Sequence, residues 1–246
     1  AMGCDVCRSF LFLPSFLPSP PTVDPTMLER LGKFFALCEK HDLQTIPTLL
    51  VGHMSGQNFD FPGQRGRSPY TDRDVVSWEI ALADTVGSVG AQHRRAIVAW
   101  ALSNEMPLWA GPTDPDTVRT WARNLVGVLH RAAPGIPVGA GDGVMNLKGG
   151  QNGFDPAVLA EAVDFLGPHS YYADRDALRH ALRIDFLLRA LMPYGKPVLL
   201  EEFGASATQA SEAAQAAYYR ETMHAAFTLG AAGALGWCYG DFELDR

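Results

Sequence analysis

The order of expected elements predicts an α/β fold, in which parallel strands alternate with helices. Short apolar segments with strand character are separated by amphipathic stretches of helical period. The expected strands cover residues 5–13, 45–51, 96–102, 136–140, 163–166, 198–201 and 234–238. Short buried strands joined by helices form either a doubly wound sheet or a (β/α)8 barrel of the TIM type.

The helices expected between these strands begin with recognisable capping residues. Asp24, Asp114 and Asp155 each stand directly before a proline, so an N-cap side chain precedes a residue suited to the first helical position. The expected helices cover residues 25–41, 71–92, 114–133, 155–162, 174–192 and 210–229. With 246 residues, 47% of them hydrophobic, the chain is long enough for one domain with a sizeable core.

Polar and aromatic residues follow nearly every expected strand, and this placement favours the barrel. A barrel builds its site from the loops at the C-terminal ends of its strands. A dinucleotide-binding sheet would instead need a GxGxxG turn after the first strand, and the sequence has none there. Each strand-end residue alone is compatible with a core role, but their repeated placement predicts a site. They are Arg8, His53, Asn104, Glu105, Asp142, His169, Tyr171, Glu202 and Trp237.

Glu105 and Glu202 are the strongest functional signal among them. Each closes a short apolar strand, and an unpaired carboxylate costs several kcal/mol to bury. A carboxylate at such a place is therefore either a structural partner, as a cap or an ion pair, or part of a site. Two carboxylates from different strands at one end of a barrel suggest acid and nucleophile chemistry on a sugar.

Composition excludes several other classes of function. The net charge is -7, and Lys and Arg are spread along the chain, which argues against a nucleic-acid partner. No apolar run reaches the roughly 20 residues that span a bilayer, so we expect no membrane insertion. The N-terminus shows no signal-peptide pattern, and the sequence leaves cytoplasmic and secreted locations open.

We expect neither a metal nor another cofactor. Cys4 and Cys7 have the spacing of one half of a zinc ribbon, but no second ligand pair follows them. Cys38 and Cys238 are isolated, so all the cysteines are expected to be buried free thiols.

The motifs at the strand ends resemble those of the family 5 glycoside hydrolases, retaining enzymes with a (β/α)8 barrel. The resemblance covers nearly the whole chain in order. It implies that Glu105, on the fourth barrel strand, is the acid/base and that Glu202, on the seventh, is the nucleophile. The matching motifs are Asn104-Glu105, His169-Ser170-Tyr171, Glu202-Phe203-Gly204 after Lys196-Pro197-Val198, and Trp237 on the last strand.

The resemblance also implies roles for the neighbouring residues. Arg8 matches an arginine that supports the nucleophile, and His169 and Tyr171 match residues around the two carboxylates. The strings GHMSG at 52–56 and NEMPL at 104–108 are similar to a subgroup that contains β-mannosidases. The expected substrate is therefore a β-linked oligosaccharide or polysaccharide, either a β-mannoside or a β-1,4-glucan.

The resemblance makes the first strand of this chain the second strand of the family's barrel. The leading βα unit and the closing helix would then be missing, which leaves seven strands in a partial barrel. An open barrel exposes sheet edges, so we expect an open seven-stranded barrel, self-association that covers the edge, or breaks in the chain.

Retention by double displacement requires carboxylates about 5 to 5.5 Å apart, and we expect this separation for the nearest oxygens of Glu105 and Glu202. Because strand residues alternate in direction, we expect Glu202 to enter the site and Glu201 to pair with a cation or cap a group outside it. Asn104 is expected to donate to the sugar 2-hydroxyl. Further substrate contacts are expected from His53, Trp109, Asp142 and Trp237.

Two alternatives remain open from the sequence. One is a catalytically impaired carbohydrate-binding or interaction protein on the same barrel, which the missing first unit favours. The other is a metal-dependent hydrolase that uses His53, His169 and Asp142. It is the weaker one, because the expected His-x-His pair is absent.

Overall fold

The computed structural model describes residues 3–148, 151–171, 177–206 and 211–240, and it has the predicted α/β architecture. The first sheet runs in the order β1 (Val6–Phe12), β2 (Gln44–Val51), β5 (Trp100–Ser103) and β6 (Val138–Gly139). The second runs in the order β7 (His169–Tyr171), β8 (Leu199–Gly204) and β9 (Gly233–Gly236). All neighbouring strands within these two sheets are parallel.

Isolated parallel bridges join the two sheets into one arc. They pair Gly139 with Phe165, Gly143 with Pro168, and Leu166 with Val198. The strand expected at 163–166 is present only as these bridges, and regular pairing starts at His169. Pro168 interrupts the ladder, because a proline has no N–H to donate.

The arc is the partial barrel that the sequence predicts. β1 and β9 stand at its two ends and are not paired with each other in the described part of the chain. The two ends of the arc are in contact near Phe10 and Trp237, whose rings meet edge to face with centroids 5.6 Å apart. Whether copies of the chain cover these edges by association stays a prediction.

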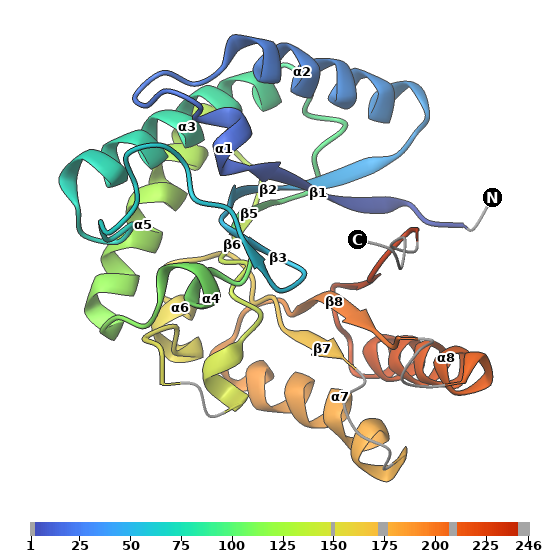
Figure 1. Cartoon of the computed structure of the whole chain (residues 1–246). Coiled ribbons are helices and arrows are strands. Elements are labelled where there is room, and N and C mark those ends of the chain that lie inside the picture. Colours follow the sequence, from blue (N-terminus) through green and yellow to red (C-terminus); the bar gives the residue numbers. More distant parts are fainter. Residues whose placement is uncertain (1–2, 149–150, 172–176, 207–210, 241–246) are drawn as a thin grey trace.

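Helices cover the outside of the arc (Figure 1). The N-cap aspartates act as the sequence predicts, and Asp24, for example, accepts a hydrogen bond from the Met27 N–H at 2.9 Å. Residues 174–176 and 210, where two helices were expected to begin, lie outside the described residues. The main helices are α2 (Pro25–Lys40), α3 (Arg73–Ala91), α5 (Pro115–Ala132), α6 (Pro156–Ala160), α7 (Ala177–Leu191) and α8 (Glu212–Thr228). None of the described helices is both long and apolar enough to cross a membrane.

Short elements that the sequence did not predict lie in the connections. Ser55 and Gly56 both have positive φ and form the tight turn of the hairpin between β3 (His53–Met54) and β4 (Gln57–Asn58). The others are the helices α1 (Leu13–Phe16) and α4 (Met106–Ala110) and the 3-10 helices η1 (Met145–Lys148) and η2 (Met192–Tyr194).

The main apolar core lies between strands and helices, and a smaller one fills the barrel interior. The interior cluster consists of Ile46, Ala99, Ala101 and Phe165. The cysteines do not match the expectation of buried thiols: all four are free, but only Cys38 is buried, and Cys4 and Cys238 are exposed.

Glu79 is a carboxylate inside the helical layer. It lies on α3 with 0% exposure and accepts a hydrogen bond from the Trp121 indole N–H at 3.1 Å. Its second oxygen has no hydrogen-bond partner among the described residues. Burial raises the pKa of Glu79 to about 8, although the Trp121 hydrogen bond opposes this shift. The folded protein therefore holds the protonated acid at neutral pH.

We predict that Glu79→Gln removes a pH dependence of stability. The folded pKa of about 8 exceeds the ordinary value of 4.5, so the stability that is present below pH 4.5 is lost as pH rises toward 8. The slope for one such group is about 1.4 kcal/mol per pH unit. Urea unfolding between about pH 5 and pH 8 should show the variant gaining relative stability as pH rises. A constant difference, matching that of the exposed Asp84→Asn on the same helix, would contradict the prediction.

Candidate active site

Glu105 lies just beyond β5 in a backbone conformation that few non-glycine residues adopt. Its φ is 47°, in the left-handed region, and α4 begins at the next residue. Its N–H donates to the Gly141 carbonyl at 2.7 Å. A Cβ on Gly141 would stand 1.8 Å from the Ser103 carbonyl oxygen, so only glycine allows this approach between the β5 and β6 loops. Strained backbone of this kind is frequent at active sites.

Glu202 lies on β8 and is held by hydrogen bonds to both of its carboxylate oxygens. Arg8, on β1, donates from Nη1 to Oε1 at 2.6 Å. The Tyr171 hydroxyl, at the end of β7, donates to Oε2. Arg8 itself is only 4% exposed and is fixed by Thr48, whose Oγ1 accepts from Nε at 3.0 Å. Two donors thus fix both carboxylate oxygens of Glu202.

The two glutamates face each other across a short distance. Ligand atoms of Glu105, His169 and Glu202 all lie within 4.8 Å of one another, so an oxygen of Glu105 is no farther than this from an oxygen of Glu202. The expectation of 5 to 5.5 Å between nearest oxygens is therefore slightly too long. Inverting glycosidases separate their carboxylates by about 6.5 to 9.5 Å, so the geometry fits retention.

His169 connects the two carboxylates from β7. Its Nδ1 lies 2.9 Å from Glu105 Oε1 and 3.5 Å from Glu202 Oε2, and the side chain is 1% exposed. Burial lowers the pKa of His169, but the charges of Glu202, Glu105 and Glu201 outweigh burial and raise it to about 9. The imidazole is therefore a cation at neutral pH and can donate to Glu105.

Asn104 and His53 form the neighbouring wall. Asn104 is 2% exposed, and its Nδ2 donates to the His53 carbonyl at 2.9 Å. Its Oδ1 has no hydrogen-bond partner among the described residues. One N–H of the Asn104 amide is therefore used within the protein, and its expected hydrogen bond to a sugar stays a prediction. His53 lies beside Glu105, with Nε2 3.9 Å from Oε2, while Nδ1 meets Asn58 Oδ1 at 2.7 Å.

Asp142 lies beyond the end of β6, and its contact with substrate stays a prediction. It is 1% exposed, and its Oδ2 accepts from the Val144 N–H at 3.1 Å, so it caps its own loop beneath the surface. Burial and the charge of Glu201 raise the pKa of Asp142 to about 7. The sequence placed Asp142 correctly at a strand end, but the loop turns it inward.

Trp109 and Trp237 are both half-buried and engaged with the protein. The Trp109 indole N–H donates to Asp60 at 2.9 Å, and its ring packs directly on Gly52, where a Cβ would approach the ring within 2.1 Å. The hydrogen bond from Trp109 to Asp60 joins α4, which directly follows Glu105, to the connection between β4 and α3. The backbone N–H of Trp237 donates to the Phe203 carbonyl at 2.7 Å, and the Trp237 ring contacts Phe10. A role for either ring in sugar stacking stays a prediction.

Glu201 departs from the strand alternation that the sequence suggested. Pairing of β8 with β9 shifts register between Leu200 and Phe203, so neighbouring residues need not face opposite ways. Glu201 lies inside the barrel, with Oε2 3.8 Å from Arg8 Nη2 and 3.6 Å from His169 Nε2. Pairing with a cation is confirmed, but Glu201 lies beneath the site. The only sequence signal for Glu201 was that it stands directly before Glu202.

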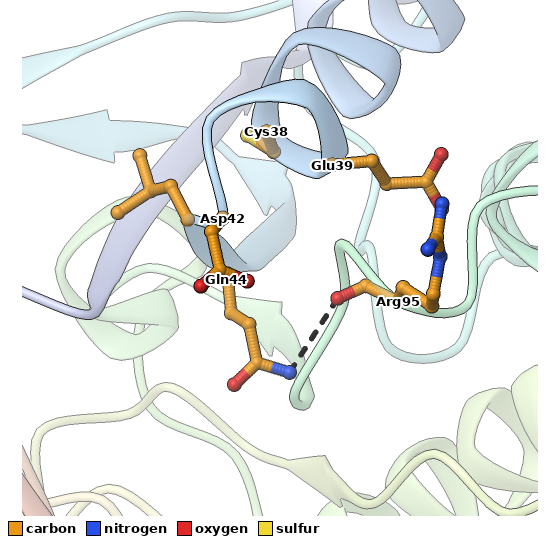
Figure 2. A pocket seen from close by; sticks show the side chains of 6 residues that line it. Cys38, Glu39, Asp42, Gln44 and Arg95 are labelled. Carbon is orange, nitrogen blue, oxygen red and sulfur yellow. Dashed lines mark hydrogen bonds and ion pairs between the residues drawn. The ribbon is translucent and has the colours of Figure 1, made fainter.

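A small cavity elsewhere in the molecule is separate from these carboxylates. It has a volume of about 60 Å³ and lies at the N-terminal ends of the strands, between Glu39, Asp42, Gln44 and Arg95 (Figure 2). Glu39 and Arg95 form an exposed ion pair of 3.9 Å there. The cavity is at the end of the barrel where active sites are not built.

The cluster of Glu105, His169 and Glu202 could also offer three ligand atoms to a metal ion. Its partners argue for another use, since both Glu202 oxygens already accept from Arg8 and Tyr171. The set expected for a metal-dependent hydrolase is not the one assembled, because Asp142 is buried as a loop cap.

We predict that Arg8→Met destabilises the protein by about 3–5 kcal/mol, because it leaves the carboxylates of Glu201 and Glu202 buried without their cation. Urea unfolding near neutral pH measures this loss. The control is Arg95→Met, which breaks an exposed ion pair and should cost less than about 1 kcal/mol. Adding Glu202→Gln to Arg8→Met should restore part of the stability. Equal effects of the two arginine substitutions would show that the buried ion pairs contribute nothing special.

Comparison with known proteins agrees with this geometry. No protein-family model matches the sequence, and a search of curated proteins finds no match. Solved structures do match. An exo-β-1,4-mannosidase from Opitutaceae bacterium strain TAV5 is 26% identical with a TM-score of 0.86, over 96% of this chain and 46% of that one.

Two further structures extend the similarity. GH5_18 from Streptomyces cattleya, in complex with Manβ1-4GlcNAc, is 21% identical with a TM-score of 0.92, over 99% of this chain and 64% of that one. An endo-β-1,4-mannanase from Thermotoga petrophila is 21% identical with a TM-score of 0.77, over 100% of this chain and 64% of that one. The chain thus spans about half to two thirds of these proteins, 46% to 64%. These similarities show that the chain shares the barrel fold of glycoside hydrolases that include a β-1,4-mannosidase, a β-1,4-mannanase and GH5_18 proteins.

Proposed function

We propose that the chain carries the active site of a retaining β-glycoside hydrolase that acts on β-mannosides. The observation that carries the proposal is the pair of carboxylates, Glu105 and Glu202, with oxygens within 4.8 Å of each other. Their surroundings differ in the way that the two roles require. Glu202 has a buried guanidinium and a phenol on its oxygens, whereas Glu105 is more exposed, with a side chain 18% accessible against 7% for Glu202.

In the first step, Glu202 attacks the anomeric carbon and Glu105 gives its proton to the departing oxygen. Arg8 and Tyr171 keep Glu202 ionised and aimed, because each holds one of its oxygens. The bond to the leaving group breaks as an ester bond to Glu202 forms. The imidazolium of His169, 2.9 Å from Glu105, stabilises the negative charge that Glu105 acquires.

In the second step, Glu105 acts as a base. Ester formation has removed the charge of Glu202, and Glu105 now accepts a proton from water as the water attacks the anomeric carbon. Glu202 leaves as a carboxylate, and Arg8 and Tyr171 again hold its oxygens. Because each step inverts the centre, the product keeps the β configuration.

The choice of β-mannoside over β-1,4-glucan rests on the similar structures. The matched proteins are named as a β-1,4-mannosidase and a β-1,4-mannanase, and a third is a complex with Manβ1-4GlcNAc. They include both exo and endo types, so aryl mannosides and β-1,4 oligosaccharides should both be tested. The matching aryl β-glucoside tests the glucan alternative.

We predict different behaviour for substitutions of the two glutamates. Glu105→Ala should lose about 10²–10⁴-fold in turnover of an aryl β-mannoside with a poor leaving group. A dinitrophenyl leaving group needs no acid, so its release should stay fast in the first step, and azide should then give β-mannosyl azide. Glu202→Ala should lose turnover entirely, and azide should give the α product. Chromatography and proton NMR identify the products.

The control for this experiment is Glu161→Gln, which changes an exposed carboxylate in ion pairs with Arg119 and Arg123 outside the site. It should leave turnover unchanged. A wild-type protein that binds mannosides but turns over neither aryl mannosides nor oligosaccharides would support the carbohydrate-binding alternative. An α product from the wild-type protein would exclude the double displacement.

A further inference from the structure

Glu201 is a buried carboxylate to which the two-step mechanism gives no role. Its side chain is 0% exposed, and neither carboxylate oxygen has a hydrogen-bond partner among the described residues. Burying a charge without hydrogen bonds is costly unless nearby opposite charges compensate. The compensating groups are Arg8 Nη2 at 3.8 Å and His169 Nε2 at 3.6 Å.

The barrel interior leaves room for this carboxylate at Gly167. A Cβ at that position would lie 2.1 Å from the Glu201 carboxyl carbon and 2.4 and 2.5 Å from its two oxygens. Any larger residue on that segment would therefore push the carboxylate away from His169. The absence of a side chain at Gly167 is therefore what allows the Glu201 carboxylate to occupy this place.

His169 has a different group on each ring nitrogen. Nδ1 faces Glu105 at 2.9 Å, and Nε2 faces Glu201 at 3.6 Å and Arg8 Nη1 at 3.4 Å. Arg8 offers only N–H groups, so it can donate to Nε2 only when the ring is neutral, whereas Glu201 stabilises a proton on Nε2. The charged or titratable groups that face the imidazole from the surrounding elements are Arg8, Glu105, Asp142, Glu201 and Glu202.

Glu201 contacts both buried cations of the site. Its Oε2 lies 3.8 Å from Arg8 Nη2 and 3.6 Å from His169 Nε2. Removing this carboxylate would leave the two cations with fewer opposite charges in the barrel interior. The cheapest relief is loss of the His169 proton, because a guanidinium does not deprotonate in proteins.

We propose that Glu201 is a positioning residue whose buried carboxylate holds His169 in its imidazolium form, so that the ring donates from Nδ1 to Glu105. The effect of Glu201 on the charge of His169 follows from the geometry alone, whereas its effect on catalysis rests on the proposed function. In that function, the fixed cation stabilises Glu105 after it has given up its proton. The carboxylates already account for a His169 pKa raised to about 9.

The test is a titration of the histidine ring nitrogens by ¹⁵N NMR in the whole protein. Wild-type His169 should stay an imidazolium through neutral pH and lose its proton near pH 9. In Glu201→Gln it should titrate lower by about one pH unit or more. The matched control is Glu39→Gln, which removes a carboxylate 3.3 Å from a different histidine, His93, and should leave the His169 titration unchanged.

An unchanged His169 titration in Glu201→Gln, or a neutral wild-type His169 at pH 7, would overturn the proposal. If Glu201→Gln does not fold, Glu201→Asp keeps the charge, and its His169 should still be an imidazolium at pH 7. A neutral ring in that variant would equally overturn it. The readout needs no turnover, so an inactive wild type with a shifted His169 would refute only the proposed function.

Where turnover is present, kinetics distinguish a Glu201 that positions His169 from a Glu201 that only maintains the fold. Glu201→Gln should lower kcat with little change in KM, and the loss should be smaller at low pH, where His169 regains its proton. A loss of kcat that is equal at all pH values would assign Glu201 a purely structural role and contradict the proposal.

Discussion

The buried guanidinium of Arg8 is the interaction on which the rest of the site depends. It donates to Glu202 at 2.6 Å, approaches Glu201 at 3.8 Å, and is fixed by Thr48 on the neighbouring strand. Carboxylates at this depth would otherwise take up protons or unfold the barrel end. One cation on β1 therefore permits two carboxylates on β8, across the interior of the arc. The apolar cluster of Ile46, Ala99, Ala101 and Phe165 also lies in the barrel interior.

A second constraint is the backbone at the strand ends. The left-handed φ of Glu105 and the close approach at Gly141 determine the position of the Glu105 side chain. The register shift on β8 determines the positions of Glu201 and Glu202. Side-chain chemistry is thus fixed by backbone geometry before any substrate is present. Such preorganisation is the usual source of transition-state stabilisation, because the dipoles need no rearrangement during the reaction.

The sequence predicted the strand and helix order, the partial barrel, and the Arg8, Glu105, His169, Tyr171 and Glu202 cluster. These follow from apolar segments, Asp-Pro caps and recognisable motifs, all of which are local signals. The side-chain directions of Asp142 and Glu201 could not be derived from the sequence, for a shared reason. Their directions depend on a loop turn and on a register shift, and both arise from pairing with distant segments. Period-two alternation cannot reveal such irregularities.

The central claim is that Glu202 forms a covalent bond to sugar while Glu105 faces it as acid and base. The most direct measurement is trapping with a 2-deoxy-2-fluoro-β-mannosyl fluoride, followed by digestion and mass spectrometry of the labelled peptide. The fluorine slows both steps, and the good leaving group lets the ester accumulate. The account predicts one label per chain, carried by Glu202. A label on Glu201 or Glu105, or none on a protein that turns over mannosides, would contradict it.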